Sequence, residues 1–239
     1  MANGVIMEAI ILAGGIGSRL RSIIKDVPKP MALVEGKPFL QIILDNLNHA
    51  GFTKVILSVG YLSDVIVGYF GDEYKKLKIE YAVENKRLGT GGAIKYALQS
   101  CSDKYAFVFN GDTFLDIDIK AVVELKKVEN LPIMVARYVD DVSRYGALTL
   151  SSNKLTKYRE KLDAGFGLIN AGCYYLPTNI MSSFADLDVF SFEEICIPAI
   201  IQNPGFVVYK HDGLFIDIGI PKDLALASKM LKNHLSYLG

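Results

Sequence analysis

The sequence predicts an α/β fold built on one Rossmann-like, mostly parallel central sheet with helices on both faces. In the first half of the chain, apolar runs of strand length alternate with segments of helical pattern. These runs are continuously apolar, whereas a strand with one face in water alternates apolar and polar residues. Strands buried on both faces are typical of a parallel sheet, and 239 residues suffice for one large domain or two lobes that share a core.

The strands and helices of the first half follow one another in order. Strands are expected at residues 9–14, 54–61, 78–84 and 105–112. Helices are expected at residues 38–51, 63–71 and 91–100, and the first of them begins at a proline and ends at a glycine. Helical connections of this kind allow successive strands to lie parallel in one sheet.

From about residue 130, the chain favours strands without long helices between them. Strands are expected at residues 132–139, 146–152, 155–161, 168–176 and 205–219. Helices are expected at residues 177–185, 191–201 and 221–231. The second half should therefore be a mixed elaboration of the same sheet. The apolar segment 191–201 is expected to lie in the core, with a homodimer contact as the alternative.

Charge and cysteine content exclude several classes of partner. Lys plus Arg and Asp plus Glu balance at 26 each, so we expect neither nucleic acid nor a membrane as partner. The three cysteines are widely spaced and form no CxxC or Cys/His cluster, which argues against a zinc site. An odd cysteine count without a secretory signal suggests reduced thiols and a cytoplasmic protein. No apolar run approaches the roughly 20 residues that span a bilayer.

A glycine-rich turn, AGGIGSRL at residues 13–20, follows the first predicted strand. Leu20 stands where GxGxxG would have its third glycine, and no GK[ST] follows as in a P-loop. Glycines at a strand's carboxyl end let the backbone approach a ligand and direct N–H groups at an anion. Arg19, and Lys29 between two prolines, would add cations that suit a polyphosphate. An ordinary strand-to-helix turn with two solvated cations is the alternative.

The segment LGTGGA, at residues 88–93, ends a loop and opens a predicted helix. Its glycines and Thr90 can present backbone groups to a flat base and a sugar hydroxyl. Glu84, just upstream, can accept hydrogen bonds from a base amine. Glycine-rich helix starts and solvated loop carboxylates are both common, so a purely structural role is the alternative for each.

Two aspartates follow apolar strands at places far apart in the sequence. Asp112 ends FVFNGD, and Asp217 lies in GLFIDIGIP. Carboxylates in apolar surroundings are costly unless they hold a cation, and hard divalent cations prefer oxygen ligands. Helix-capping or turn aspartates are the alternative. That interpretation is preferred for Asp116, as a turn residue, and for Asp118, as an N-cap.

Taken in order, the motifs LAGGIGSRL…PKP, LGTGGA, NGD, YREK, INAGCYYL and FIDIGIP resemble those of the sugar-1-phosphate nucleotidyltransferases. Within that family, IKDVPKPM, LGTGGAIK, RYG and GLINAG make the chain most similar to the D-glycero-D-manno-heptose 1-phosphate guanylyltransferases. The resemblance implies a nucleotide-diphospho-sugar transferase fold. It also implies one domain over residues 1–239, with a nucleotide-binding half at about 7–115 and a mixed, sugar-phosphate-binding half at about 116–239.

The resemblance implies roles for single residues. Catalytic roles fall on Arg19, Lys29 and Asp112, and a Mg²⁺ cofactor would be held by Asp112 and Asp217. The residues implied to bind the nucleotide are Leu12, Ala13, Gly14, Gly15, Gly17, Ser18, Glu84, Gly89, Thr90 and Gly111. The residues implied to bind the sugar phosphate are Gly146, Glu160, Lys161 and Asn170.

The implied reaction transfers GMP from GTP to D-glycero-α-D-manno-heptose 1-phosphate and releases pyrophosphate, for surface polysaccharide synthesis. The attacking phosphate oxygen is already anionic at neutral pH, so no general base is required of the three histidines. Three alternatives stay open. They are a mannose- or glucose-1-phosphate nucleotidyltransferase using another NTP, a catalytically silent NDP-sugar-binding regulatory protein, and a dinucleotide oxidoreductase, which the glycine spacing disfavours.

Overall fold

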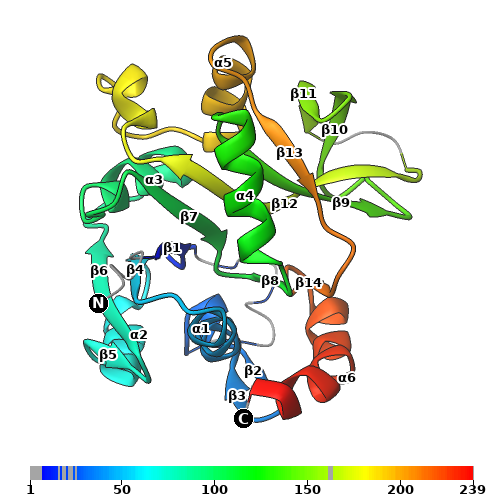
Figure 1. The fold of residues 1–239 in the computed structure, drawn as a ribbon. Coiled ribbons are helices and arrows are strands. Elements are labelled where there is room, and N and C mark those ends of the chain that lie inside the picture. The colour runs from blue at the N-terminus through cyan, green and yellow to red at the C-terminus, as the bar shows by residue number, and fades with distance from the viewer. Residues whose placement is uncertain are drawn as a thin grey trace, which may run out of the picture.

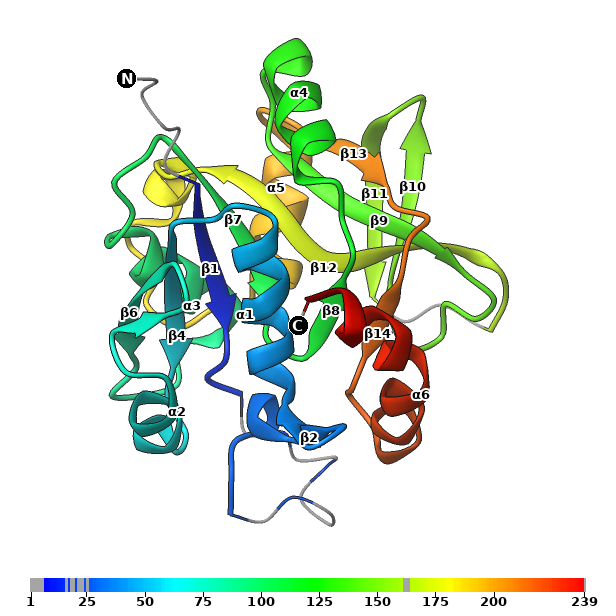
Figure 2. The ribbon, with the colours of Figure 1, turned by 60° about the horizontal axis from the view of Figure 1, so that its bottom comes forward.

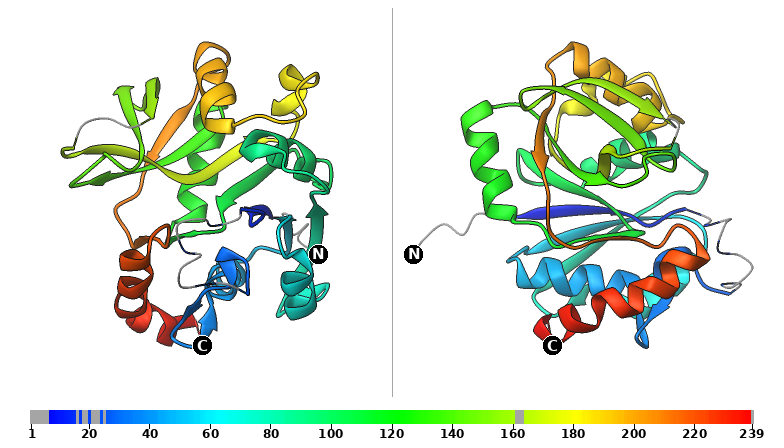
Figure 3. Two further views of the ribbon diagram at one scale, coloured as in Figure 1. Left: turned by 180° about the vertical axis from the view of Figure 1, so that it is seen from behind. Right: turned by 90° about the vertical axis from the view of Figure 1, so that its right-hand side faces the viewer.

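The computed structural model describes residues 7–15, 17, 20, 24, 26–160 and 164–238. Within these residues, a ten-stranded sheet has the order β10-β11-β13-β9-β12-β7-β1-β4-β6-β5. Figure 1 shows this sheet passing through the centre of the molecule, and the right-hand view of Figure 3 shows helices on both of its sides. The predicted α/β class, with one central sheet covered on both faces, is confirmed.

The first half of the chain forms the parallel part of the sheet. Its strands are β1 (Glu8–Leu12), β4 (Lys54–Val59), β6 (Leu77–Val83) and β7 (Tyr105–Asn110). Its helices are α1 (Phe39–His49), α2 (Ser63–Phe70) and α3 (Gly89–Leu98). Each of these elements lies within two residues of its predicted bounds. Four short strands were not predicted, namely β2 (Leu33–Val34), β3 (Lys37–Pro38), β5 (Glu73–Tyr74) and β8 (Thr113–Leu115).

Each parallel strand contributes to two hydrophobic cores, because successive side chains point to opposite faces of a sheet. Ile11 packs into the core that contains α1, whereas Ile10 packs into the core that contains α3. Leu40 of α1 and Ile94 of α3 are fully buried in these cores. Figure 2 shows α1 beside β1. Burial on both faces explains why the strands are continuously apolar.

The strand order reverses between β1 and β7. From β1, the chain proceeds outward through β4 to β6, and α3 then returns it to the other side of β1. There β7 pairs with β1 in parallel, and Leu12 lies opposite Asn110 at the carboxyl ends of the two strands. Ligands of open α/β sheets bind beyond such a reversal point.

The second half adds the mixed part of the sheet. Its strands are β9 (Ile133–Val139), β10 (Gly146–Ser151), β11 (Lys154–Glu160), β12 (Gly167–Pro177) and β13 (Val207–Lys210). The strand β12 is antiparallel to both β7 and β9 and so joins the two halves in one sheet. A separate antiparallel pair, β8 (Thr113–Leu115) with β14 (Phe215–Asp217), lies at the end of β7.

The single strand predicted at residues 205–219 is wrong, because the segment divides into β13 and β14, which belong to different sheets. His211 lies in the break. Its backbone N–H donates to the Ala136 carbonyl at 2.7 Å, and its ring Nε2 lies 3.2 Å from the Leu214 carbonyl oxygen. These bonds turn the chain from the large sheet into the small one.

Two predicted helices also differ from the structure. Residues 177–185 contain only a 3₁₀ turn, Ile180–Phe184, in which the Ser182 hydroxyl donates to the Asn179 carbonyl and competes with helical bonds. Residues 191–201 form a π turn, Phe192–Cys196, followed by α5 (Ile197–Gln202). Because Phe192, Cys196 and Ile197 are buried, this segment is core as expected. The homodimer contact stays a prediction.

The helix α4 (Ile119–Glu129) is missing from the sequence prediction, although its cap was foreseen. The Asp118 carboxylate accepts a hydrogen bond from the Ala121 N–H at 3.0 Å, as expected of an N-cap. The closing helix α6 extends over Pro221–Leu238, further than the predicted end at residue 231.

Candidate active site

The two loops that follow β1 and β7 pack tightly against each other. The Gly111 N–H donates to the Leu12 carbonyl at 3.0 Å, and a Cβ on Gly111 would lie 2.6 Å from that same oxygen. Only glycine therefore allows β7 to end this close to β1. The next residue, Asp112, is brought to the reversal point of the sheet.

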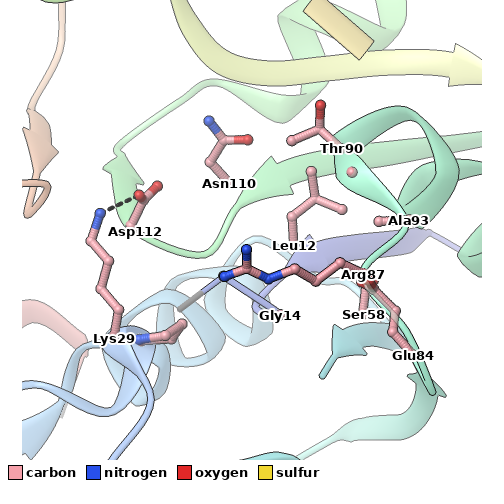
Figure 4. A pocket seen from close by; sticks show the side chains of 13 residues that line it. Leu12, Gly14, Lys29, Ser58, Glu84, Arg87, Thr90, Ala93, Asn110 and Asp112 are labelled. Atoms are coloured by element: carbon pink, nitrogen blue, oxygen red, sulfur yellow. Dashed lines mark hydrogen bonds and ion pairs between the residues drawn. The ribbon is translucent and has the colours of Figure 1, made fainter. Parts of the chain in front are cut away.

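A first cavity of about 340 Å³ opens at this point. Figure 4 shows its lining, which comes from the ends of β1 and β7, the turn around Lys29, and the start of α3. The residues that were predicted from the sequence and line it are Leu12, Gly14, Gly15, Lys29, Glu84, Gly89, Thr90 and Asp112. Ala13 is buried behind this wall, where its N–H donates to the Ser58 carbonyl.

A second cavity, of about 360 Å³, lies beside the first. It is lined from the second half of the chain by Asn170, Arg144 and Asp217, and from the first half by the glycine loop. Lys29 and Asp112 line both cavities. The two cavities therefore meet at this lysine and this aspartate, and Gly15 and Asn110 also line both.

Lys29 and Asp112 form an ion pair between the two cavities. Lys29 opens a 3₁₀ turn, Lys29–Met31, with prolines at positions 28 and 30, and its side chain is only 13% exposed. Gly17 adopts a φ of +61°, and a Cβ there would lie 2.7 Å from the Lys29 Cβ. The glycine loop and the Pro-Lys-Pro segment that follows it in the sequence are thus packed together.

Asp217 lies next to Asp112 because β14 pairs with β8. Asp217 is the register partner of Thr113, and the Ile218 N–H donates to the Asp112 carbonyl at 2.9 Å. The Asp217 side chain is 19% exposed, and its Oδ1 accepts the Gly219 N–H at 2.7 Å. The predicted pair of strand-end carboxylates is brought to one wall of the second cavity.

The electrostatics of this carboxylate pair suit a cation. Burial raises the pKa of the Asp217 carboxyl, and the neighbouring Asp112 carboxylate raises it further. Lys29, the Gly219 N–H and Arg144 oppose this rise in pKa without cancelling it. The described residues hold no group of three or more metal-binding side chains. Two carboxylates still suffice for Mg²⁺, which takes its remaining ligands from water and substrate phosphates.

Glu84 and Thr90 line the first cavity, but protein groups already engage their side chains. Glu84 accepts hydrogen bonds from the Ser58 hydroxyl at 3.1 Å and from the Leu88 N–H at 3.2 Å. The Thr90 hydroxyl donates to Glu193 and accepts the Phe192 N–H at 2.8 Å. These bonds hold the loop before α3 and attach the start of α3 to the π turn.

The glycines of LGTGGA are required mainly by packing. A Cβ on Gly89, which has a φ of +72°, would lie 2.4 Å from the Phe190 carbonyl oxygen. A Cβ on Gly91 would lie 2.3 Å from the Phe190 ring, and one on Gly92 would lie 2.5 Å from the Asp188 carbonyl oxygen. Close packing therefore accounts for these glycines, and the nucleotide-binding role of Gly89, which lines the first cavity, stays a prediction.

The predicted sugar-phosphate residues divide into two groups. Asn170 lines the second cavity, where its side chain donates to the Tyr174 hydroxyl at 2.6 Å. Gly146 and Glu160 face each other across β10 and β11 and line neither of the two cavities. A Cβ on Gly146 would lie 2.2 Å from the Tyr158 hydroxyl, so packing explains this glycine.

Three predicted residues lie outside the described residues, namely Ser18, Arg19 and Lys161.

Two arginines of the site were not singled out from the sequence. Arg87 lines the first cavity and directly precedes LGTGGA. Arg144 lines the second cavity, and its guanidinium lies 2.6 Å from Asp223 and 3.8 Å from Asp217. Arg144 is the first residue of the RYG motif, and membership of that motif could have marked it as a site residue.

Comparison with known proteins identifies the family. The family model described as nucleotidyl transferase matches residues 8–234. The chain belongs to the nucleotidyl transferase family. None of its described helices combines the length and the apolar character that a membrane span requires.

Two relatives of this nucleotidyl transferase carry the same name. The D-glycero-alpha-D-manno-heptose 1-phosphate guanylyltransferase of Campylobacter jejuni is 43% identical over 91% of this chain and 96% of its own. The enzyme of the same name from Aneurinibacillus thermoaerophilus is 36% identical over 96% of this chain and 100% of its own. The crystal structure of HddC from Yersinia pseudotuberculosis has a TM-score of 0.84 at 36% identity and covers 94% of this chain and 99% of that one. HddC has also been solved in complex with GMP-PN.

These findings agree with the resemblance read from the motifs. The nucleotide-diphospho-sugar transferase fold is confirmed, and the relatives are guanylyltransferases, as the motifs implied. Family membership and the glycine spacing together disfavour a dinucleotide oxidoreductase.

Proposed function

We propose that this nucleotidyl transferase transfers GMP from GTP to D-glycero-α-D-manno-heptose 1-phosphate, giving GDP-heptose and pyrophosphate. The observation that carries the proposal is the meeting of two cavities at Lys29 and Asp112. A reaction between two phosphorylated substrates needs two adjoining binding sites with a cation between them. The names of the two heptose-phosphate relatives support the choice of substrates.

The first cavity would hold the nucleotide, and the second the sugar phosphate. All the residues that line the first cavity lie between positions 12 and 112, within the proposed nucleotide-binding half at 7–115. The second cavity takes Asn170, Arg144 and Asp217 from the proposed sugar-phosphate-binding half at 116–239. Arg19 with the glycine loop, and Lys161 after β11, are proposed to hold the phosphates of the two substrates.

The reaction forms one bond and breaks one bond at the α-phosphorus. A phosphate oxygen of the sugar phosphate bonds to this phosphorus, and the bridging oxygen to the β-phosphate leaves with pyrophosphate. The nucleophile is already ionised, so the residues must align the phosphates and offset their mutual repulsion. Lys29 is placed to do so at the reacting phosphate, because it borders both cavities. Asp112 and Asp217 would hold Mg²⁺, which neutralises charge on the phosphates when bound.

The proposed function also implies a cellular compartment for the protein and a reaction that consumes its product. The three cysteines are free thiols, two of them buried, which fits the reducing cytoplasm, where nucleoside triphosphates are available. The product would be consumed by a glycosyl transfer reaction of surface polysaccharide synthesis, because NDP-sugars are activated glycosyl donors.

Pyrophosphate release with Mg²⁺ tests the proposal. GTP, ATP, CTP, UTP and dTTP are each combined with heptose, mannose, glucose and N-acetylglucosamine 1-phosphates. A signal confined to GTP and the heptose phosphate is expected. A different active pair would replace the substrates while keeping the two-cavity mechanism. Folded protein that is silent with every pair would favour the NDP-sugar-binding regulatory protein.

A further inference from the structure

The loop between β6 and α3 carries two adjacent cations that point in different directions. Lys86 approaches Asp188, with its Nζ 3.9 Å from the carboxylate, and both side chains are mostly exposed. Arg87 lines the first cavity instead. Figure 4 shows its guanidinium extending from the Glu84 end of the cavity toward Lys29.

The backbone that carries Arg87 is anchored on both sides. Before it, the Glu84 N–H donates to the Val59 carbonyl at 2.8 Å. After it, the Leu88 N–H donates to the Glu84 carboxylate, and the Leu88 carbonyl accepts the Phe190 N–H at 2.9 Å. Hydrogen bonds on both sides thus fix the backbone at Arg87, and its side chain extends into the first cavity.

Arg87 differs from the other charged side chains of the first cavity in its partners. Lys29 and Asp112 neutralise each other, and Glu84 accepts two hydrogen bonds. Among the described residues, none forms a hydrogen bond or an ion pair with the Arg87 guanidinium. Arg87 is exposed to solvent. A guanidinium carries five N–H donors in a planar fork that matches phosphate oxygens.

We propose that Arg87 binds the phosphate chain of the nucleotide and covers it in the first cavity, a role that rests on the proposed function. The guanidinium reaches toward Lys29 and Asp112, where the reacting phosphate would lie, and away from the Ala93 end of the cavity. Arg87 does not line the second cavity, so its contribution is confined to the nucleotide.

A series of ligands with increasing numbers of phosphates tests this role. Binding of guanosine, GMP, GDP and GTP is measured by calorimetry for the wild type, Arg87→Gln, Arg87→Lys and the control Lys86→Gln. One lost charge-assisted hydrogen bond lowers affinity on the order of 10- to 100-fold. Arg87→Gln should lose this much for GTP, less for GMP and nothing for guanosine. Arg87→Lys should recover part of the loss, and Lys86→Gln should bind as the wild type does.

Steady-state kinetics give a second readout. Arg87→Gln should raise the KM for GTP and leave the KM for the sugar phosphate unchanged. Melting temperatures confirm that each variant is folded, as expected for exposed side chains. An equal loss across the whole series, guanosine included, would assign Arg87 to the base and overturn the proposal, as would unchanged GTP binding.

The same series with adenine, cytosine, uracil and thymine nucleotides separates this inference from the proposed function. If the wild type binds another base, the guanine assignment fails, but the phosphate dependence of the Arg87 effect is still measured. If the wild type binds no nucleotide, both fail.

Discussion

Lys29 is held rigidly at the boundary between the two cavities. Prolines flank it, Gly17 packs against its Cβ, and Asp112 pairs with its ammonium group. In the proposed reaction, a cation in this position would contact the α-phosphate throughout the transfer, because no large movement is needed between substrate and product.

Replacing Lys29 by alanine should therefore reduce turnover without unfolding the protein. We expect kcat to fall by at least about 10²-fold, the loss typical when one electrostatic contact to a transition state is removed. Pyrophosphate release measures the loss, and the melting temperature reports on the fold. Lys120→Ala, at an exposed position in α4, is the matched control. Turnover like that of the wild type in Lys29→Ala would remove this lysine from the mechanism.

Asp217 is the residue on which the proposed metal site can be tested separately from phosphate binding. Asp217→Asn keeps the shape of the side chain, so the Gly219 N–H retains an oxygen acceptor, and removes the negative charge. We expect the Mg²⁺ concentration for half-maximal turnover to rise by about tenfold or more. Direct binding of Mn²⁺, followed by its paramagnetic resonance in the presence of GTP, gives a readout other than activity. An unchanged metal titration would contradict the assignment.

At the residue scale, the sequence predicted the places of Lys29, Asp112 and Asp217 better than the bonds that engage Thr90. Lys29 opens a turn flanked by prolines, Asp112 follows β7 and Asp217 ends β14, so local pattern indicated their surroundings. The bonds of Thr90 to Glu193 and Phe192 span more than 100 positions, and no local pattern encodes them. Arg87 and Arg144 were missed because an arginine in a loop is usually solvated.

The start of α3 packs closely against the segment before the π turn, next to the first cavity. The Gly91 N–H donates to the Phe190 carbonyl at 3.0 Å, and the Phe190 N–H donates to the Leu88 carbonyl at 2.9 Å. This mutual bonding satisfies helix-terminal N–H groups that would otherwise need a cap. It also fixes the wall formed by Gly89 and Thr90.

Gly91→Ala should therefore destabilise the protein, although alanine favours helices. Its Cβ would lie 2.3 Å from the Phe190 ring, and overpacking of this kind costs about 1–3 kcal/mol. Gly68→Ala is the matched control, because Gly68 is exposed in α2 and its Cβ would meet nothing within 4 Å. That change should stabilise by about 0.5–1 kcal/mol. Urea unfolding measures both, and a stable Gly91→Ala would show that Phe190 moves aside freely.

At the element scale, prediction succeeded where local pattern decides the structure. The parallel strands and their helices lie within two residues of prediction because their apolar periodicity is strong. The π turn at Phe192–Cys196 and the break between β13 and β14 depend on tertiary hydrogen bonds. In the 3₁₀ turn at Ile180–Phe184, a bond from the Ser182 hydroxyl competes with the helical bonds. Periodicity alone does not contain that information.

At the scale of the whole molecule, the site requires both halves of the chain. The strand β12 joins them in one sheet, and β14 returns to pair with β8, next to Asp112. Arg144 adds a further link, because it joins the turn before β10 to Asp223 in the first turn of α6. Correct placement of Asp217 thus depends on the path of the chain after β13.

His211 lies on that path, and we expect it to make the folded state less stable in acid. Burial lowers the pKa of its imidazole, and Arg137 acts in the same direction. In contrast, the hydrogen bond with the Leu214 carbonyl raises the pKa of the His211 imidazole, and the nearby carboxylates of Asp116 and Asp212 raise it too. Since burial prevails, the folded state holds the neutral imidazole more strongly than the unfolded state does.

The sign of the linkage follows from this lowered pKa. The contribution of His211 to stability is complete above its unfolded pKa of about 6.5 and is lost as the pH falls toward the lower folded pKa. One proton changes the free energy of unfolding by at most about 1.4 kcal/mol per pH unit. Urea unfolding at about pH 7.5 and pH 5.5 should therefore show a smaller pH-dependent loss in His211→Gln than in the wild type. His49→Gln, at an exposed position in α1, should keep the wild-type loss. Equal losses in the wild type and His211→Gln would mean that another group governs acid stability.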